Sequence, residues 1–189
     1  MKLHFEGKYD GNPEHLKNQR YVNGSIKFRE PSLRVFALIA NVLSVVLLVI
    51  TATFAIWRGG SASFSVIGLI AAIASLVPHE YIHAVVFKND VYMYTDIKHG
   101  LLFVVGSESM SRSRFICMSL LPNIVFGILP YAVFVIWPRL KILGTMGAFC
   151  IAFGAGDYIN VFNALTQMPR NAVTYLYRQN SYWYIPEDR

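Results

Sequence analysis

Long runs without a charged side chain constrain this chain more than any other feature of its sequence. Residues 35–57 and 115–137 each give 23 positions without Asp, Glu, Lys or Arg, and residues 59–78 give 20 more. Residues 142–169 hold one charged residue, Asp157, in 28 positions. About 20 apolar helical residues cross the hydrocarbon core of a bilayer. We therefore expect an all-α membrane protein with four transmembrane helices. Their expected bounds are 35–57, 61–87, 115–137 and 142–168.

A soluble helical core is the alternative explanation of these runs. It would require four helices that are apolar all round, in a chain of 189 residues that is too short to surround them. Charged residues make up only 15% of the chain and hydrophobic residues 54%, which excludes a disordered chain and argues against a soluble globule. The two cysteines cannot form a disulfide framework. The lipid bilayer is therefore an expected partner.

The basic residues are distributed unevenly along the chain. With four crossings, residues 1–34, 88–114 and 170–189 lie on one side of the membrane, and they hold fourteen of the 17 Lys and Arg residues. The positive-inside rule places this side in the cytoplasm. We expect an integral protein of the cytoplasmic membrane with both termini in the cytoplasm. The net charge of +6 then reports orientation and requires no nucleic-acid partner.

This count predicts a cytoplasmic polar arm at 1–34, a membrane domain at 35–169 and a cytoplasmic aromatic tail at 170–189. Between the second and third spans, residues 91–95 and 101–105 are rich in aromatic and branched side chains and flank a turn at 98–100. This pattern predicts a short cytoplasmic β-hairpin over 91–105. In the tail, residues 173–177 and 182–185 form either a second hairpin or an aromatic belt at the membrane interface.

A metal-binding motif lies near the cytoplasmic end of the second span. His79, Glu80 and His83 give the pattern HExxH, which places two imidazoles one turn apart on one helix face. Two such imidazoles can chelate one Zn²⁺, and the glutamate can act as a general base toward water. Two histidines and a glutamate in an apolar segment are costly unless they pair or bind a ligand. The motif therefore predicts a Zn²⁺ site with Glu80 as its catalytic residue.

A tetrahedral catalytic zinc needs a third protein ligand and one open position. Asp157 is the favoured candidate, because it and His79 lie roughly 13–18 Å from the cytoplasmic ends of their spans at 1.5 Å per residue. Asn123 lies at similar depth in the third span. It can donate to the substrate carbonyl or form an interhelical hydrogen bond, and the second is favoured. Asn160 and Asn163 can orient Asp157.

Gly154, Gly156 and Asp157 also match the GxGD pattern of intramembrane aspartyl proteases. That chemistry needs a second carboxylate on another span, close enough to share a proton. The remaining aspartates lie in the central loop or near the termini. The aspartyl interpretation therefore fails, and zinc ligation is the better use of Asp157.

The chain resembles a family of small bacterial integral-membrane zincin peptidases, domain of unknown function 3267. These look like distant relatives of the site-2-protease class of intramembrane metalloproteases. The resemblance runs from about residue 30 onward and rests on His79–Glu80–Tyr81–Ile82–His83, residues 107–111 and 120–123, Gly156–Asp157 and the closing Tyr182–Trp183–Tyr184. It implies zinc ligation by His79, His83 and Asp157, and activation of water by Glu80.

We expect a zinc-dependent endopeptidase, intramembrane or membrane-proximal, that cleaves a membrane protein or peptide. The hairpin over 91–105 is a candidate holder of an unwound substrate segment, as an added strand. A non-catalytic scaffold or regulator with a zinc site is the main alternative, although such a protein needs no general base. A transporter is disfavoured because the outer halves of the spans contain no charged residue.

Overall fold

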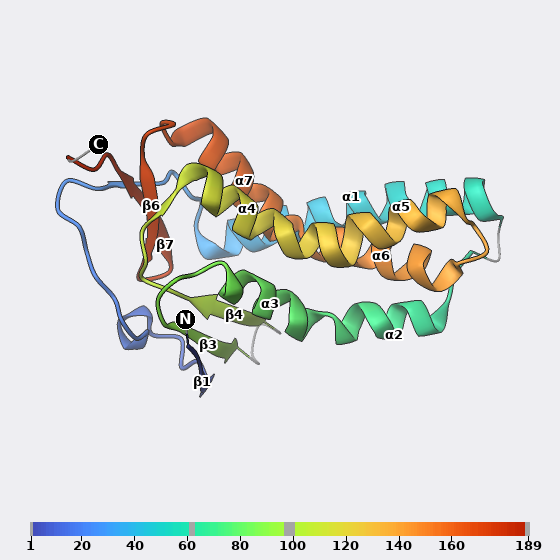
Figure 1. Cartoon of the computed structure of the whole chain (residues 1–189), viewed down its shortest axis with the longest axis horizontal. Helices are drawn as coiled ribbons and strands as arrows, with labels where there is room; N and C mark the ends of the chain where they lie inside the picture. The colour runs from blue at the N-terminus through green and yellow to red at the C-terminus, as the bar shows by residue number, and fades with distance from the viewer. Residues whose placement is uncertain (1, 61–62, 97–100, 188–189) are drawn as a thin grey trace. The chain divides into compact units, whose positions relative to one another are not determined.

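The charge-free segments fold into helices in the computed structural model, which describes residues 2–60, 63–96 and 101–187 (Figure 1). Helix α1 (Leu33–Gly59) is 27 residues long. Large apolar side chains along it, such as Leu38, Val45 and Ile50, are about 60% exposed. Surface of this kind is unfavourable in water and is accommodated by lipid. Helix α1 is therefore suited to a bilayer.

The remaining helices come in three groups along the chain. Their bounds are α2 (Val66–Ala74) and α3 (Leu76–Val85); α4 (Arg112–Asn123), the π-helix η2 (Ile124–Ile128) and α5 (Leu129–Ile136); and α6 (Lys141–Phe153) and α7 (Ala155–Gln167).

Three helical segments are long and apolar enough to cross a membrane, and this number corrects the expected four. They are Leu33–Gly59, Val66–Val85 and Arg112–Ile136. Helices α6 and α7 are bent by 49° at their junction, so they give a fourth crossing only if the bent pair counts as one. The bend lies at Gly154, where an added Cβ would be 1.7 Å from Asn123 Oδ1. A run of 28 residues with a single charged residue does not reveal such a break.

Contacts divide the chain into two units, which we describe separately. The helical unit contains residues 31–79 and 119–160. In it α6 packs against α1, α2 and α5. The approach of α2 to α6 is close, because a Cβ on Gly68 would lie 2.5 Å from the Ile142 carbonyl oxygen. Small residues permit such backbone approach between membrane helices.

The strand-containing unit comprises residues 1–30, 80–118 and 161–189 and holds two sheets. The first has the order β1-β3-β4, with β1 (Leu3–Lys8) parallel to β3 (Val91–Asp96) and β3 antiparallel to β4 (Leu101–Val105). The second has the order β2-β7-β6-β5. Its strands are β2 (Ile26–Lys27), β5 (Met110–Ser111), β6 (Val173–Tyr177) and β7 (Asn180–Tyr184). A short 3₁₀ helix, η1 (Pro13–His15), follows β1.

The expected all-α fold is therefore wrong, because the protein combines helices with two β-sheets. Strands β3 and β4 form the hairpin predicted over 91–105, and its predicted turn at 98–100 lies outside the described residues. In the tail, β6 and β7 pair antiparallel. Residues 1–34 also contain strands, with β1 paired to β3 in the first sheet and β2 paired to β7 in the second. Their partners are distant in sequence, so local patterns do not show the pairing.

Candidate metal centre

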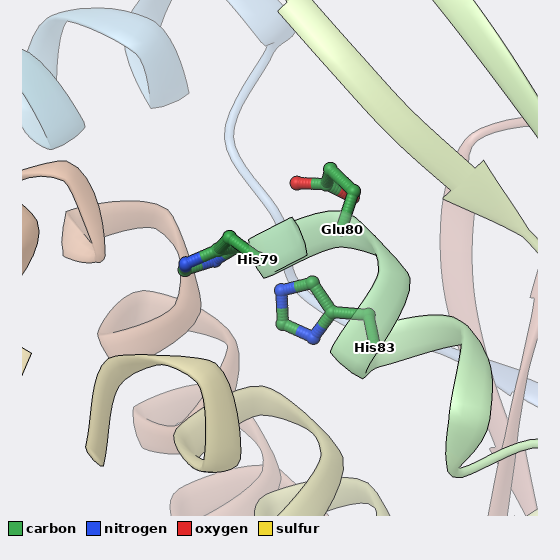
Figure 2. Close-up of side chains that lie close together, drawn as sticks. All are labelled: His79, Glu80 and His83. Atoms are coloured by element: carbon green, nitrogen blue, oxygen red, sulfur yellow. The ribbon is translucent and has the colours of Figure 1, made fainter. Parts of the chain in front are cut away.

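Helix α3 carries all three residues of the HExxH motif. One ligand atom from each of His79, Glu80 and His83 lies within 4.8 Å of the others. Figure 2 shows both imidazoles projecting from the same side of α3, one turn apart, with Glu80 beside them. His79 and Glu80 are half-buried and His83 is 9% exposed. The local geometry of the motif is thus the one that its spacing predicts.

A break in the second apolar segment precedes the motif. Helix α2 ends at Ala74 and α3 begins at Leu76, with Ser75 between them. Pro78 has no N–H for the carbonyl of Ala74, which weakens the helix here. The Ser75 hydroxyl donates to the Ala72 carbonyl oxygen at 2.7 Å. The break between α2 and α3 therefore lies directly before the motif.

Asp157 contacts the first histidine of the motif. Its Oδ2 lies 3.2 Å from Nε2 of His79. Asp157 belongs to the first turn of α7, where the helix N-terminus favours negative charge. The depth argument placed the two residues at the same level, and within the helical unit they lie together.

Asn123 holds the carboxylate of Asp157. Its Nδ2 donates to Asp157 Oδ2 at 2.7 Å and to the Ser119 carbonyl oxygen at 2.9 Å. Asn123 is fully buried, and its Oδ1 faces Gly154. The interhelical hydrogen bond favoured by the sequence is therefore present. A role for Asn123 toward substrate stays a prediction.

The other two asparagines of α7 differ in their surroundings. Asn163 is 8% exposed, and its Oδ1 accepts a hydrogen bond from Gln167 Nε2 at 3.0 Å. That bond stays within α7. Asn160 is half-buried and lies one turn after Asp157. Its role in orienting Asp157 stays a prediction.

The second histidine is oriented by a main-chain group. His83 Nδ1 lies 2.9 Å from the carbonyl oxygen of Met118 in α4. A carbonyl oxygen only accepts, so Nδ1 must carry the proton, and Nε2 keeps its lone pair. Metal-binding histidines commonly donate their second ring N–H to a carbonyl or carboxylate in this way. His83 therefore presents Nε2 as its ligand atom.

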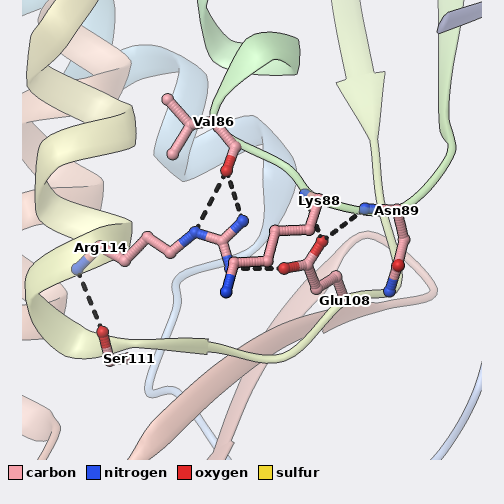
Figure 3. A network of polar contacts seen from close by, with 6 residues as sticks. All are labelled: Val86, Lys88, Asn89, Glu108, Ser111 and Arg114. Atoms are coloured by element: carbon pink, nitrogen blue, oxygen red, sulfur yellow. Dashed lines mark hydrogen bonds and ion pairs between the residues drawn. The ribbon is translucent and has the colours of Figure 1, made fainter. Parts of the chain in front are cut away.

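A polar network holds the C-terminal end of α3 (Figure 3). The Arg114 guanidinium donates to the Val86 carbonyl oxygen through Nε at 3.1 Å and also through Nη2. Arg114 Nη1 donates to Glu108. The Glu108 carboxylate accepts the main-chain N–H groups of Lys88 and Asn89 at 2.7 and 2.9 Å. The network ties the segment after α3 to the start of α4.

Sequence reasoning missed this network. It counted Arg114 only as a basic residue of the central loop, and it included Glu108 in a matching segment without a role. Burial raises the pKa of the Glu108 carboxyl, but the Asn89 N–H, Arg114 and the Lys88 N–H lower it more. The pKa of Glu108 is therefore below its ordinary value. The one sequence signal for this ion pair was the six-residue spacing between Glu108 and Arg114, on either side of a strand-to-helix junction.

The donor set fits zinc. The two imidazoles of α3, with a glutamate beside them, match the HExxH arrangement of zincin-type catalytic sites. His83 already has the tautomer that ligation through Nε2 requires. The ligand atoms of His79, Glu80 and His83 lie close together in space, and this proximity supports a metal site of the zincin class.

Comparison with known families agrees with this class. The chain belongs to the family called Putative zincin peptidase, domain of unknown function 3267, whose model matches residues 72–173, just over half of the chain. The matched range contains α3, α4 and α7. Membership supports a zinc metallopeptidase in general. Searches of curated proteins and of solved structures find no match.

Proposed function

We propose that the protein is a zinc-dependent endopeptidase that hydrolyses peptide bonds of membrane-associated substrates. The observation that carries the proposal is the position of the metal motif within the apolar segment Val66–Val85. A peptidase whose donors lie in a membrane-spanning segment meets substrates in the bilayer or at its surface. Charged and imidazole groups in such segments mark functional sites, because they are costly there otherwise.

The ligand set of this proposal is His79, His83 and Asp157. The Met118 carbonyl orients His83 through Nδ1, and Asn123 holds the carboxylate of Asp157. Zinc, when bound, supplies a Lewis acid that lowers the pKa of water and polarises the peptide carbonyl. Two imidazoles and one carboxylate would hold the ion, the number of protein ligands that catalytic zinc sites use.

Glu80 is the proposed general base and acid. It follows His79 directly on α3, which puts its carboxylate beside the ligand atoms. In the proposed reaction Glu80 takes the proton from the attacking water and then gives it to the leaving amine. The water oxygen first forms a C–O bond to the peptide carbonyl carbon, the C–N bond then breaks, and the amine leaves with the proton that Glu80 took from the water.

The substrate segment is proposed to bind in an extended form. Strand β4 lies at an edge of its sheet, and an edge strand offers main-chain N–H and C=O groups to an added strand. Hydrolysis of a helical membrane segment requires the scissile bond to be unwound first. The edge of β4 is therefore the proposed holder of the unwound segment.

Replacement of Glu80 by Gln tests the catalytic proposal. We expect Glu80→Gln to turn over single-span peptides in liposomes at least 100-fold more slowly, because general acid–base catalysis contributes about 10²–10⁴-fold. Its zinc content is expected to be unchanged. Cleavage is measured by mass spectrometry and zinc by atomic absorption. Glu187→Gln, at an exposed position, is the control. Equal turnover of Glu80→Gln and wild type would favour the alternative, a non-catalytic scaffold or regulator with a zinc site.

A further inference from the structure

The carbonyl of Met118 is available to His83 for a reason that lies one turn further along α4. In an α-helix the carbonyl of residue i accepts the N–H of residue i+4. The residue four positions after Met118 is Pro122, which lies inside α4 and has no N–H. The i+4 main-chain donor to the Met118 carbonyl is therefore missing, and Nδ1 of His83 lies 2.9 Å from this carbonyl oxygen.

We propose that Pro122 is a positioning residue for the second zinc ligand. By removing one helical hydrogen bond, it leaves the Met118 carbonyl to accept Nδ1–H of His83, and this fixes Nε2 as the ligand atom. The inference rests on the proposed zinc site and deepens it. Pro122 touches neither metal nor substrate in this role and acts through Met118 and His83.

Steric and solvent effects act in the same direction. The ring of a proline in a helix interior clashes with the carbonyl of residue i−4 and tilts it away from the helix axis. Pro122 is less than 2% exposed, and the neighbouring Ser119 is 1% exposed. Water therefore has little access to this side of α4. A carbonyl without a partner in such surroundings costs free energy, which the bond from His83 removes.

The adjacent residue serves another proposed ligand. Asn123 donates to the carboxylate of Asp157. Pro122 acts because its main chain has no N–H, and Asn123 acts because its side-chain Nδ2 donates a hydrogen bond. Two consecutive residues of α4 thus each orient one ligand, which gives a physical role to the Leu120–Leu121–Pro122–Asn123 segment.

Pro122→Ala is the direct test, because alanine restores the N–H that competes for the Met118 carbonyl. We expect zinc affinity, measured by competition with a chromophoric chelator, to fall about 10–100-fold, the usual effect of losing a group that orients a ligand. Pro130→Ala is the matched control. It restores an N–H in the same apolar segment, at the start of α5, and is expected to bind zinc like the wild type.

A spectroscopic measurement separates positioning from general stability. In zinc-loaded wild type labelled with ¹⁵N in the histidine rings, we expect His83 to be protonated at Nδ1, with that signal shifted in Pro122→Ala. Wild-type affinity and an unchanged His83 signal in Pro122→Ala would overturn the inference and leave the zinc site intact. If Pro122→Ala does not fold, protonation of wild-type His83 at Nε2 overturns it. A wild type that binds no zinc removes the proposed function and this inference together.

Discussion

Asp157 is the residue on which the ligand set depends most. A carboxylate in an apolar helix is costly, and three features of its surroundings offset this cost. His79 Nε2 lies 3.2 Å from Oδ2, Asn123 donates to the same oxygen at 2.7 Å, and α7 begins at Ala155. The same features hold the carboxylate where it can share an ion with His79.

Replacement of Asp157 tests its role as third ligand. We expect Asp157→Ala to lower zinc affinity by 100-fold or more, because loss of a direct ligand exceeds the roughly 10–100-fold effect of losing an orienting group. Asp157→Asn keeps the shape of the side chain but not its charge. Its zinc affinity is expected to lie between those of Asp157→Ala and wild type. Zinc content after dialysis against a chelator measures both.

The control for this series is Asp90→Asn, which changes a carboxylate in the loop between α3 and β3. It is expected to retain full zinc content. Full zinc content in Asp157→Ala would place the third ligand elsewhere.

Single residues of the site differ in how far the sequence predicts them. HExxH defines His79, Glu80 and His83 through helical spacing alone. The pairing of His79 with Asp157 follows from equal depth in two apolar segments. The link from His83 to Met118 could not be predicted, because it depends on which carbonyl of α4 faces the ring. A proline inside an apolar run was its only trace in the sequence.

At the scale of elements, the C-terminal end of α3 is fixed by charged groups. Val86 ends this segment with its carbonyl bound by Arg114, while Glu108 accepts two main-chain N–H groups beyond it. The Glu108 side chain is 9% exposed and that of Arg114 is 23% exposed. Loss of one partner would leave the other poorly solvated, so the network is expected to stabilise the motif helix.

The lowered pKa of Glu108 gives this network a pH dependence. A carboxyl with a depressed folded-state pKa contributes stability above its unfolded pKa, about 4.3, and loses it as pH falls through the folded value. We expect Glu108→Gln to be less stable than wild type by about 1–3 kcal/mol at pH 7. The difference should shrink below about pH 4. Thermal unfolding in detergent at both pH values measures it, with Glu187→Gln as control. A stability difference between Glu108→Gln and wild type that does not change with pH would contradict the role given to the ionised Glu108 carboxylate.

The helices were more predictable than the strands, for a physical reason. An apolar run of about 20 residues specifies a helix by itself, because its main chain must be satisfied internally in lipid. A strand depends on a partner. His4 of β1 pairs with Tyr92 of β3, 88 positions away, and Ile26 of β2 pairs with Trp183. The bend at Gly154 was also hidden, since it depends on the contact with Asn123.

At the scale of the whole molecule, the sheets constrain how the chain crosses a membrane. Strand β1 of the arm bonds to β3 of the central segment, β5 of the central segment to β6 of the tail, and β2 of the arm to β7. Hydrogen-bonded strands cannot be separated by a bilayer. The arm, the central segment and the tail are therefore proposed to lie on one side. The chain returns to that side after α5 only if the bent pair α6–α7 counts as one crossing.

Charge decides which side this is. The three segments hold fourteen of the 17 basic residues, so by the positive-inside rule we propose that they lie in the cytoplasm. We expect tags at the N- and C-termini to resist protease added to intact bacterial spheroplasts and to be cleaved in inverted membrane vesicles. A tag inserted after Gly60, in the connection between α1 and α2, is the control and should show the reverse. Termini on opposite sides would show that α6–α7 does not return the chain, and would contradict the pairings of β2 with β7 and of β5 with β6. Both tags cleaved in spheroplasts would preserve the sheets but reverse the orientation, and would place the metal motif near the outer surface.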